Sequence, residues 1–588
     1  MALSVSTLIG VCVSSYDRFP TTVIAGYGSE AVTEGWEAIT ARLAAIMPQD
    51  GVLAIEAYPG VDDDAVLSHL EALKPALLVS TRELFPEPAE LTARLKPFLT
   101  DDRVFGRMCY FDLADLMEPE RLEAAREQVN AAEGPVVVYG WGSTLVHPGD
   151  ELVFFDMTRW EITLRYRAGM TNYRAENADE DSLRKIKRGY YVEWRVADKH
   201  KMTFFDRMNL FVDTVDTDAP KMLAGDAVRD GLSQIARRPF RLKPYFDPGV
   251  WGGQWMKRVC GLDPEADNYA WSFDGVPEEN ALILAYGDRT IELPAMDLTL
   301  TQPLALLGED VYARFGAEYP IRFDFLDTVG GQNLSLQVHP TTEYEHRQFG
   351  MAYTQDESYY ILDADEGATV YLGLKEGVDP DEMIEALREA NAGGKPFDAE
   401  RYVNRFPAKK HDHFLIPAGT IHCSGAGAMV LEISATPYNN TFKLWDWGRL
   451  GLDGKPRPVH VDHGSRVIRW DRTTPWVEEN LVNAVTVVNE DEHVREEHTG
   501  LHELEFIETR RLWIEDEVTI DNGGSVNQLN LVEGERALVE SLDGSFEPYE
   551  VHYAETFIVP AAVKGYRLVN PTGECIGVIR AYVRKPQA

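Results

Sequence analysis

The chain has 588 residues, 44% of them hydrophobic, which is enough for several packed cores. Lysine and arginine total 57 against 96 aspartate and glutamate, so the formal net charge is −39. A surface so acidic repels polyphosphate backbones and anionic lipid, and we expect neither a nucleic-acid partner nor a membrane. A small anionic substrate is not excluded, because a local basic pocket is screened from a distant acidic surface over about 10 Å.

The N-terminus and the cysteines favour a reducing compartment. The first basic residue is Arg18, so the charged region of a signal peptide is missing. The five cysteines are widely spaced and form no CxxC pair. We therefore expect a cytoplasmic protein.

Residues 1–215 alternate strand-like apolar runs with helical patterns. The segments at 51–58 and 134–141 are typical of buried strands, whereas 34–47 and 120–132 carry apolar residues at helical spacing. This alternation predicts an α/β domain with a largely parallel sheet. We expect residues 216–238 to be a linker.

The segment at 53–73 has the strand, turn and helix of a P-loop, and it resembles the start of small sugar or nucleoside kinases. A working loop needs Gly-Lys-Ser/Thr to cradle phosphates, but Asp62, Asp63 and Asp64 stand there. The resemblance implies a degenerate, P-loop-kinase-like domain used for assembly or regulation. A plain α/β domain is the alternative.

From residue 239 onward, many short strand patterns are separated by Gly, Pro and Asp turns, which predicts an all-β sandwich or barrel. One helical pattern interrupts them at 379–394. The segment at 555–569 repeats the order of 413–422, an apolar run, a proline and a small-residue turn, without the histidine. We expect two barrels of one type, the first at 239–470 and a second, metal-free one at 471–588.

Four potential metal ligands lie in the first of these regions. In LSLQVHP (334–340), strand alternation points Gln337 and His339 to the same face. Glu357 starts another apolar run, and His422 closes the turn IPAGTIH. Two imidazoles, a carboxylate and an amide oxygen suit Zn²⁺ and are compatible with Mn²⁺ or Fe²⁺. We expect one such ion per chain.

Several motifs, in one order, resemble the type I mannose-6-phosphate isomerases, which are metal-dependent cupins. They are LKPYFDPGVWGGQWM (242–256), LSLQVHP, the Glu357 segment, HDHFLIPAGTIHCSGAGAMVLEIS (411–434), TFKLWDWGR (441–449) and KPRPVHV (455–461). The resemblance implies a bicupin of two jelly-roll barrels and the interconversion of mannose 6-phosphate with fructose 6-phosphate. It also implies that Gln337, His339, Glu357 and His422 bind zinc and that Glu432 lies near the substrate.

Aldose–ketose isomerisation moves a proton between C1 and C2, so it needs a Lewis acid and a base. Glu432 is the candidate base, and a role in orienting a metal ligand is the alternative. The family's active-site arginine falls on Lys443, which keeps the charge without the bidentate fork.

The expected substrate site departs from the family pattern. Two family lysines fall on Asp324 and Gln355, whereas Ser335 stands at the position of a serine near the substrate phosphate. Lys409 and Trp251 complete the expected site.

The loss of two cations keeps open an isomerase of a non-phosphorylated sugar and a cupin that senses sugar without turnover. Gln337 and the Trp-Gly-Gly signature argue against a cupin oxygenase. The expected partner is a small sugar or sugar phosphate, and a homo-oligomer stays open.

Overall fold

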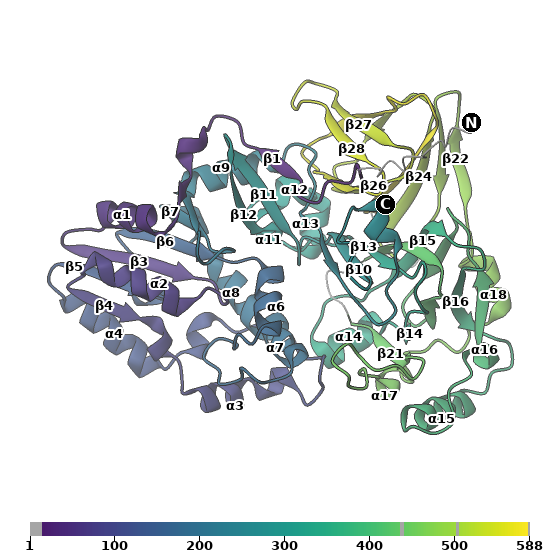
Figure 1. Cartoon of the computed structure of the whole chain (residues 1–588), viewed down its shortest axis with the longest axis horizontal. Coiled ribbons are helices and arrows are strands. Elements are labelled where there is room, and N and C mark those ends of the chain that lie inside the picture. Colours follow the sequence, from purple (N-terminus) through teal and green to yellow (C-terminus); the bar gives the residue numbers. More distant parts are fainter. Residues whose placement is uncertain (1–13, 436–439, 501, 503–504, 586–588) are drawn as a thin grey trace, which may run out of the picture.

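The computed structural model describes residues 14–435, 440–500, 502 and 505–585. An α/β unit occupies one end of the molecule and antiparallel sheets fill the other, with a small sheet between them (Figure 1). In this described part of the chain, no helix combines the length and the apolar character needed to cross a membrane. The expectation of a multi-domain protein with mixed sheets is confirmed.

The N-terminal unit is built on a seven-stranded sheet. Five strands are parallel in the spatial order β4-β5-β3-β6-β7, and β8 and β2 extend the β7 edge antiparallel. The strands are β2 (Thr33–Glu34), β3 (Gly51–Ala57), β4 (Leu77–Ser80), β5 (Pro135–Tyr139), β6 (Glu151–Asp156), β7 (Leu210–Asp213) and β8 (Lys221–Ala224).

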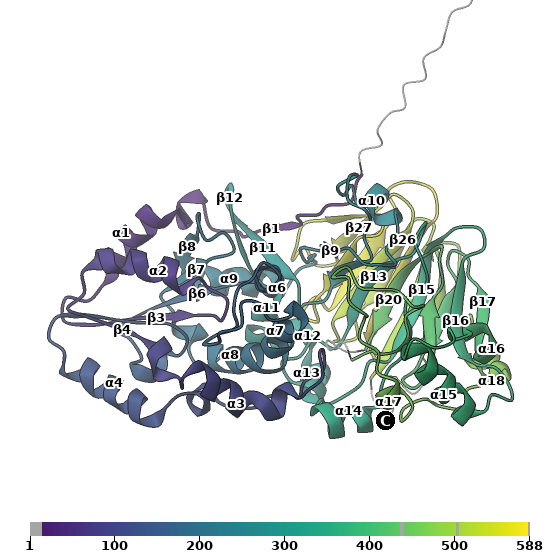
Figure 2. The ribbon, with the colours of Figure 1, turned by 60° about the horizontal axis from the view of Figure 1, so that its bottom comes forward.

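Helices cover both faces of this sheet, with α1 and α2 on one side and α3 and α4 on the other (Figure 2). The central strands are therefore continuous apolar runs, as parallel strands buried on both faces require. The helices are α1 (Trp36–Ile46), α2 (Asp63–Leu70), α3 (Pro88–Leu99), α4 (Pro119–Ala131), α5 (Ser143–Val146), α6 (Arg159–Arg167), α7 (Ser182–Arg188), α8 (Trp194–Lys201) and α9 (Gly225–Ile235).

The expected linker at 216–238 is wrong. Within it, β8 pairs with β7, and α9 buries Val228 and Leu232 completely. The first described strand, β1 (Thr21–Val23), in contrast lies outside this unit, because it pairs with β11 (Ala281–Tyr286). The α/β unit therefore ends near Ile235 rather than at residue 215.

Two of the three aspartates after β3 have hydrogen-bond partners within the α/β unit. Asp62 caps α2 by accepting a hydrogen bond from the Ala65 amide at 3.0 Å. Asp63 accepts one from the Tyr139 hydroxyl at 2.7 Å, and burial raises the pKa of Asp63 to about 6. These contacts explain the carboxylates without a phosphate, and the kinase resemblance stays a prediction.

A three-stranded sheet joins the two ends of the molecule in the order β1-β11-β12. Its other strands and the helices that follow them are β11 (Ala281–Tyr286), β12 (Arg289–Pro294), α11 (Ala295–Thr301), α12 (Pro303–Leu307) and α13 (Glu309–Phe315). The Lys201 ammonium of α8 lies 2.9 Å from Asp156 and 2.6 Å from Asp297 of α11, all fully buried. This ion cluster ties the α/β unit to the rest.

A pair of antiparallel sheets follows, ordered β18-β15-β20-β13-β10-β9 and β17-β16-β19-β14-β21. The strands are β9 (Tyr245–Asp247), β10 (Trp271–Gly275), β13 (Arg322–Asp327), β14 (Leu336–Val338), β15 (Glu357–Ala364), β16 (Thr369–Leu374), β17 (Val403–Pro407), β18 (His413–Ile416), β19 (His422–Ser424), β20 (Ala428–Ser434) and β21 (Phe442–Trp445). The helices are α10 (Trp255–Val259), α14 (Thr342–Phe349), α15 (Pro380–Asn391), α16 (Ala399–Tyr402), α17 (Val461–Gly464) and α18 (Thr474–Asn480). Helix α15 lies where the sequence shows its helical insert.

The last pair of sheets is ordered β22-β23-β24-β31-β26-β29 and β25-β30-β27-β28. Its strands are β22 (Thr486–Glu490), β23 (Val494–His498), β24 (Ile507–Ile514), β25 (Glu517–Asp521), β26 (Asn527–Glu533), β27 (Arg536–Ser541), β28 (Tyr549–His552), β29 (Thr556–Val559), β30 (Gly565–Val569) and β31 (Ile576–Val583). One apolar core runs from the α/β unit into the first pair, and a second core lies inside this last pair.

The buried ion cluster predicts a large, local stability effect. Lys201→Met leaves Asp156 and Asp297 without their cation, so the unfolding free energy should fall by about 3–5 kcal/mol. Lys199→Met is the matched control, since Lys199 lies on the same helix with 53% of its side chain exposed. Urea unfolding measures both, and equal midpoints for the two variants would contradict the cluster's role.

Candidate metal centre and catalytic pocket

Three side chains from neighbouring strands converge in the first sheet pair. His339 directly follows β14, Glu357 begins β15 and His422 begins β19. Their potential ligand atoms all lie within 4.8 Å of one another, and each side chain is buried. Among the described residues, these three form the one group of His, Cys, Asp or Glu side chains that lie close enough together to hold a metal ion.

The donor atoms suit a cation. Nδ1 of His422 lies 2.9 Å from the Thr420 carbonyl and Nδ1 of His339 lies 3.3 Å from that of Asn440, so each Nε2 keeps its lone pair for a metal. Nε2 of His422 lies 2.6 Å from Glu357 Oε1, and Nε2 of His339 lies 3.1 Å from Glu357 Oε2. His339 Nε2 and Glu357 Oε1 have no partner of hydrogen-bond geometry within the described residues, a deficit that a divalent ion would remove.

Gln337 is the fourth member of the expected set. Its amide nitrogen lies 3.2 Å from Nε2 of His422, opposite which it is paired between β14 and β19. Rotation of the amide by half a turn would bring its oxygen to the same place. The structure thus brings all four expected ligands together.

A tight turn aims His422 at this cluster. Gly419 adopts a φ of +88°, and its amide donates to the His339 carbonyl at 2.9 Å. A Cβ at Gly419 would lie 2.8 Å from the Val467 carbonyl oxygen, so only glycine fits. The turn therefore fixes one ligand strand against the next.

Glu432 lies beside the cluster on β20, and its Oε1 accepts hydrogen bonds from Gln355 at 2.9 Å and from Ser434. Burial, and then the charges of Asp324 and Glu357, raise the pKa of Glu432 well above its usual range. Such a group holds a proton where an ordinary carboxyl does not, as a general acid or base does.

Gln355 joins the base candidate to a ligand candidate. Its Nε2 donates to Glu432 and, at 3.1 Å, to Oε2 of Glu357. The structure thus places Gln355 between two carboxylates, where sequence comparison had placed a lost phosphate cation.

These groups line a cavity of about 120 Å³, which is small beside the roughly 300–1,000 Å³ of common ligand sites. The charged and polar residues that line it, besides those already described, are Arg322, Asp324, Ser335, Thr441, Lys443, Arg457 and His460. Its apolar wall includes Trp271 and Phe273.

Two arginines that were not expected from the sequence also line the cavity. Arg322, on the same strand face as Asp324, donates to it at 3.1 Å, and both are buried. Arg457 donates to Ser335 Oγ at 3.0 Å and to Asp446 at 3.1 Å. Arg322 could have been expected from the alternation of β13, and Arg457 stands in the motif KPRPVHV.

Lys443 has no hydrogen-bond or ion-pair partner for its ammonium within the described part of the chain. Burial and the neighbouring Arg457 lower its pKa to about 8. Two other expected residues do not line the cavity: Lys409 is exposed, and Trp251 is fully buried behind Trp271, with ring centroids 4.7 Å apart.

The donor geometry predicts which residues hold a metal. His339→Ala or His422→Ala removes one of the imidazoles, so either variant should lose most of the metal carried by the wild-type protein. His493→Ala, at an exposed histidine of the last sheet pair, is the control. Elemental analysis decides the matter, and equal metal content in all four proteins would refute the assignment.

Comparison with known proteins gives a family model and several curated relatives. A family model described as "Domain of unknown function (DUF8485)" matches residues 35–237. The mannose-6-phosphate isomerase of Streptococcus mutans is 26% identical over 232 residues, 39% of this chain and 67% of that protein. Mannose-6-phosphate isomerase ManA of Bacillus subtilis is 28% identical over 237 residues, 40% of this chain and 69% of that protein.

Solved structures of mannose 6-phosphate isomerases also align with this chain. The mannose 6-phosphate isomerase from Bacillus subtilis aligns with a TM-score of 0.47 at 18% identity, covering 59% of this chain and 100% of that one. A mannose 6-phosphate isomerase bound with zinc and yttrium gives a TM-score of 0.44 at 14% identity, with the same coverage. Over about 40% of its length, the chain is thus similar to curated proteins named mannose-6-phosphate isomerase, in keeping with the motifs that it shares with the type I family.

Proposed function

We propose that the protein is a metal-dependent aldose–ketose isomerase acting on mannose 6-phosphate and fructose 6-phosphate or a closely related sugar. The relatives carry the name of this activity. The observation that carries the proposal is the cavity itself, which is lined by Glu357 of the His339, Glu357 and His422 cluster, by Glu432 and by Lys443.

The metal in this proposal is one Zn²⁺ per chain, held by His339, Glu357 and His422 together with Gln337. Mn²⁺ and Fe²⁺ suit the same donors. A bound ion of this kind supplies Lewis-acid polarisation of the sugar oxygens at the reacting carbons.

Glu432 is the group that moves the proton between C1 and C2. Its Oε1 is held by Gln355 and Ser434, whereas its Oε2 receives no hydrogen bond from the described residues. Oε2 is therefore the atom left for the substrate, and Gln355 acts as a positioning residue that fixes the carboxyl plane.

The far end of the substrate meets Lys443, Arg457 and Ser335. The Lys443 ammonium, together with the N–H groups of Arg457, which is paired with Asp446, and the Ser335 hydroxyl, suits a phosphate group. Asp324 does not oppose it as the sequence suggests, because Arg322 neutralises that carboxylate at 3.1 Å. The phosphorylated sugar is therefore preferred over the free sugar, and a sensor without turnover is the remaining alternative.

The proposal includes the architecture of two cupin barrels, of which only the first binds metal. In the first, Pro417 precedes the turn that ends at His422. In the second, Pro560 precedes the corresponding turn, and Gly565 begins β30 at the place of the histidine. Glycine offers no ligand there.

Removing the proton carrier should slow the chemical step. Glu432→Gln keeps the shape but not the acid–base function, so kcat should fall by about 10²–10⁴-fold. Zinc content should stay unchanged, because Glu432 is not among the proposed ligands. A variant that keeps wild-type kcat would exclude Glu432 as the proton carrier.

Lys443→Gln tests the charged end of the cavity. If the ammonium faces a phosphate, the ratio of kcat/KM for mannose 6-phosphate to that for mannose should fall about tenfold or more, which corresponds to about 1.4 kcal/mol. Lys409→Gln, exposed and outside the cavity, is the matched control. An unchanged ratio in Lys443→Gln would contradict a phosphate at this end.

A further inference from the structure

The catalytic cavity is closed in part by the N-terminal α/β unit. Val104 and Phe105 line it together with residues of β10, β13, β14 and β21. They belong to residues 100–106, here called the closing loop, which follows α3. Figures 1 and 2 both show α3 reaching from the α/β unit toward α14 of the first sheet pair.

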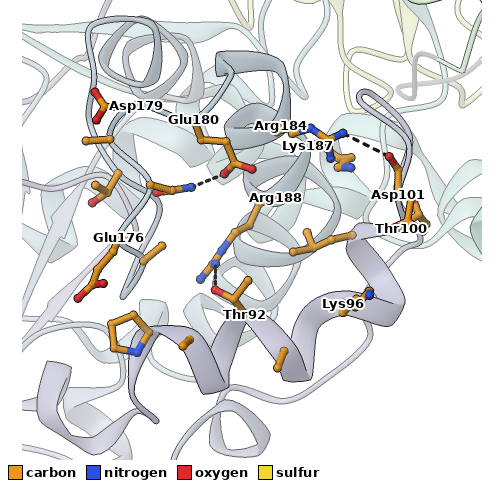
Figure 3. A pocket seen from close by; sticks show the side chains of 18 residues that line it. Thr92, Lys96, Thr100, Asp101, Glu176, Asp179, Glu180, Arg184, Lys187 and Arg188 are labelled. Atoms are coloured by element: carbon orange, nitrogen blue, oxygen red, sulfur yellow. Dashed lines mark hydrogen bonds between the residues drawn. The ribbon is translucent and has the colours of Figure 1, made fainter.

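The closing loop is held in one conformation by its own side chains. The Asp102 carboxylate accepts hydrogen bonds from the amides of Val104 at 2.6 Å and Phe105 at 2.7 Å. The Thr100 hydroxyl donates to the Phe105 carbonyl at 2.6 Å. On the outer side, Arg184 donates to the Asp101 carbonyl at 3.3 Å, beside a separate cleft of the α/β unit (Figure 3).

The closing loop is also anchored to the sheets that carry the metal cluster. The Phe105 ring centroid lies 4.4 Å from that of His460, 5.5 Å from Phe442 and 5.6 Å from Phe349. Asp102 lies 3.2 Å from Nε2 of His460. The ring of Phe105 thus packs among the rings of Phe349, Phe442 and His460, which together are called the aromatic socket below.

A second contact reaches a metal ligand. The Tyr191 hydroxyl of the α/β unit donates to Oδ1 of Asn440 at 2.8 Å, fully buried. The Asn440 carbonyl is the group 3.3 Å from Nδ1 of His339. The α/β unit therefore holds the residue that orients this imidazole.

A larger cavity lies on the other side of Val104. It measures about 340 Å³ and is lined by rings of both units, among them Trp160, Tyr190 and Tyr245. Val104, Trp271 and Phe273 line both this cavity and the catalytic one. Val104 is the smallest of these three residues and the one that belongs to the α/β unit. A substitution at Val104 is therefore the simplest way to change the wall between the two cavities.

We propose that the α/β unit completes the active site and that Val104 is a specificity-determining residue, which limits the substrate to a single sugar unit. This deepens the proposed isomerase function and rests on it. A sugar that carries a second ring would need the space beyond Val104, and the Val104 side chain of the closing loop blocks access to that space.

Two substitutions at Val104 test this in the full-length, zinc-loaded protein. Val104→Ala widens the passage, so kcat/KM for a 1,4-linked mannose disaccharide relative to mannose should rise about tenfold or more. Val104→Trp fills the cavity, so kcat/KM for mannose 6-phosphate should fall by a similar factor. The exposed Val488→Ala is the control. The proposal would be overturned if, at unchanged zinc content, Val104→Ala kept the wild-type ratio and Val104→Trp kept the wild-type kcat/KM for mannose 6-phosphate.

A readout independent of sugar turnover uses Phe105. Phe105→Ala empties the aromatic socket, so zinc should pass to a coloured chelator several-fold faster than from the wild type. The exposed Phe19→Ala should match the wild type. If no sugar is turned over but Phe105→Ala still speeds zinc loss, the isomerase proposal fails and the closing role stands. Unchanged zinc loss in Phe105→Ala would overturn the closing role.

Discussion

The interaction on which the proposed site depends is the close approach of buried lone pairs on two imidazole nitrogens and one carboxylate. His339 and His422 each use Nδ1 at a backbone carbonyl, which leaves both Nε2 atoms beside the Glu357 carboxylate. Without a cation this arrangement is costly, because acceptors are desolvated without donors. The close pairing of β14 with β19 and the glycine turn before His422 hold that arrangement in place.

Around this centre, the cavity separates its charges. The carboxyl of Glu432 has a raised pKa beside the cluster of His339, Glu357 and His422, while Lys443 gives the cavity positive charge. Arg322 cancels Asp324 by direct pairing. A sugar with one end at a metal and the other at cations fits this polarity. The α/β unit adds the closing loop, so segments far apart in the chain line this cavity.

Sequence patterns predicted the features that depend on local periodicity. Alternation placed Gln337 and His339 on one face, and the proline–glycine turn indicated the direction of His422. The same rule, applied to Arg322 and Asp324, would have revealed their pairing. Long-range contacts were out of reach: nothing local tells that Val104 enters a cavity built by later strands. The prediction of a linker at 216–238 failed because β8 is a short strand whose partners, β7 and β2, are visible only in the sheet.

The proposed function requires that this single cavity, with a metal bound, isomerises a mannose-type sugar. The most direct measurement is ¹H NMR of mannose 6-phosphate incubated in deuterium oxide with the full-length, zinc-loaded protein. If the cavity is an isomerase site, fructose 6-phosphate appears, and the recovered aldose carries deuterium at C2 because the proton on Glu432 exchanges with solvent. Neither ketose nor deuterium, at full zinc content and with free mannose equally inert, would contradict it.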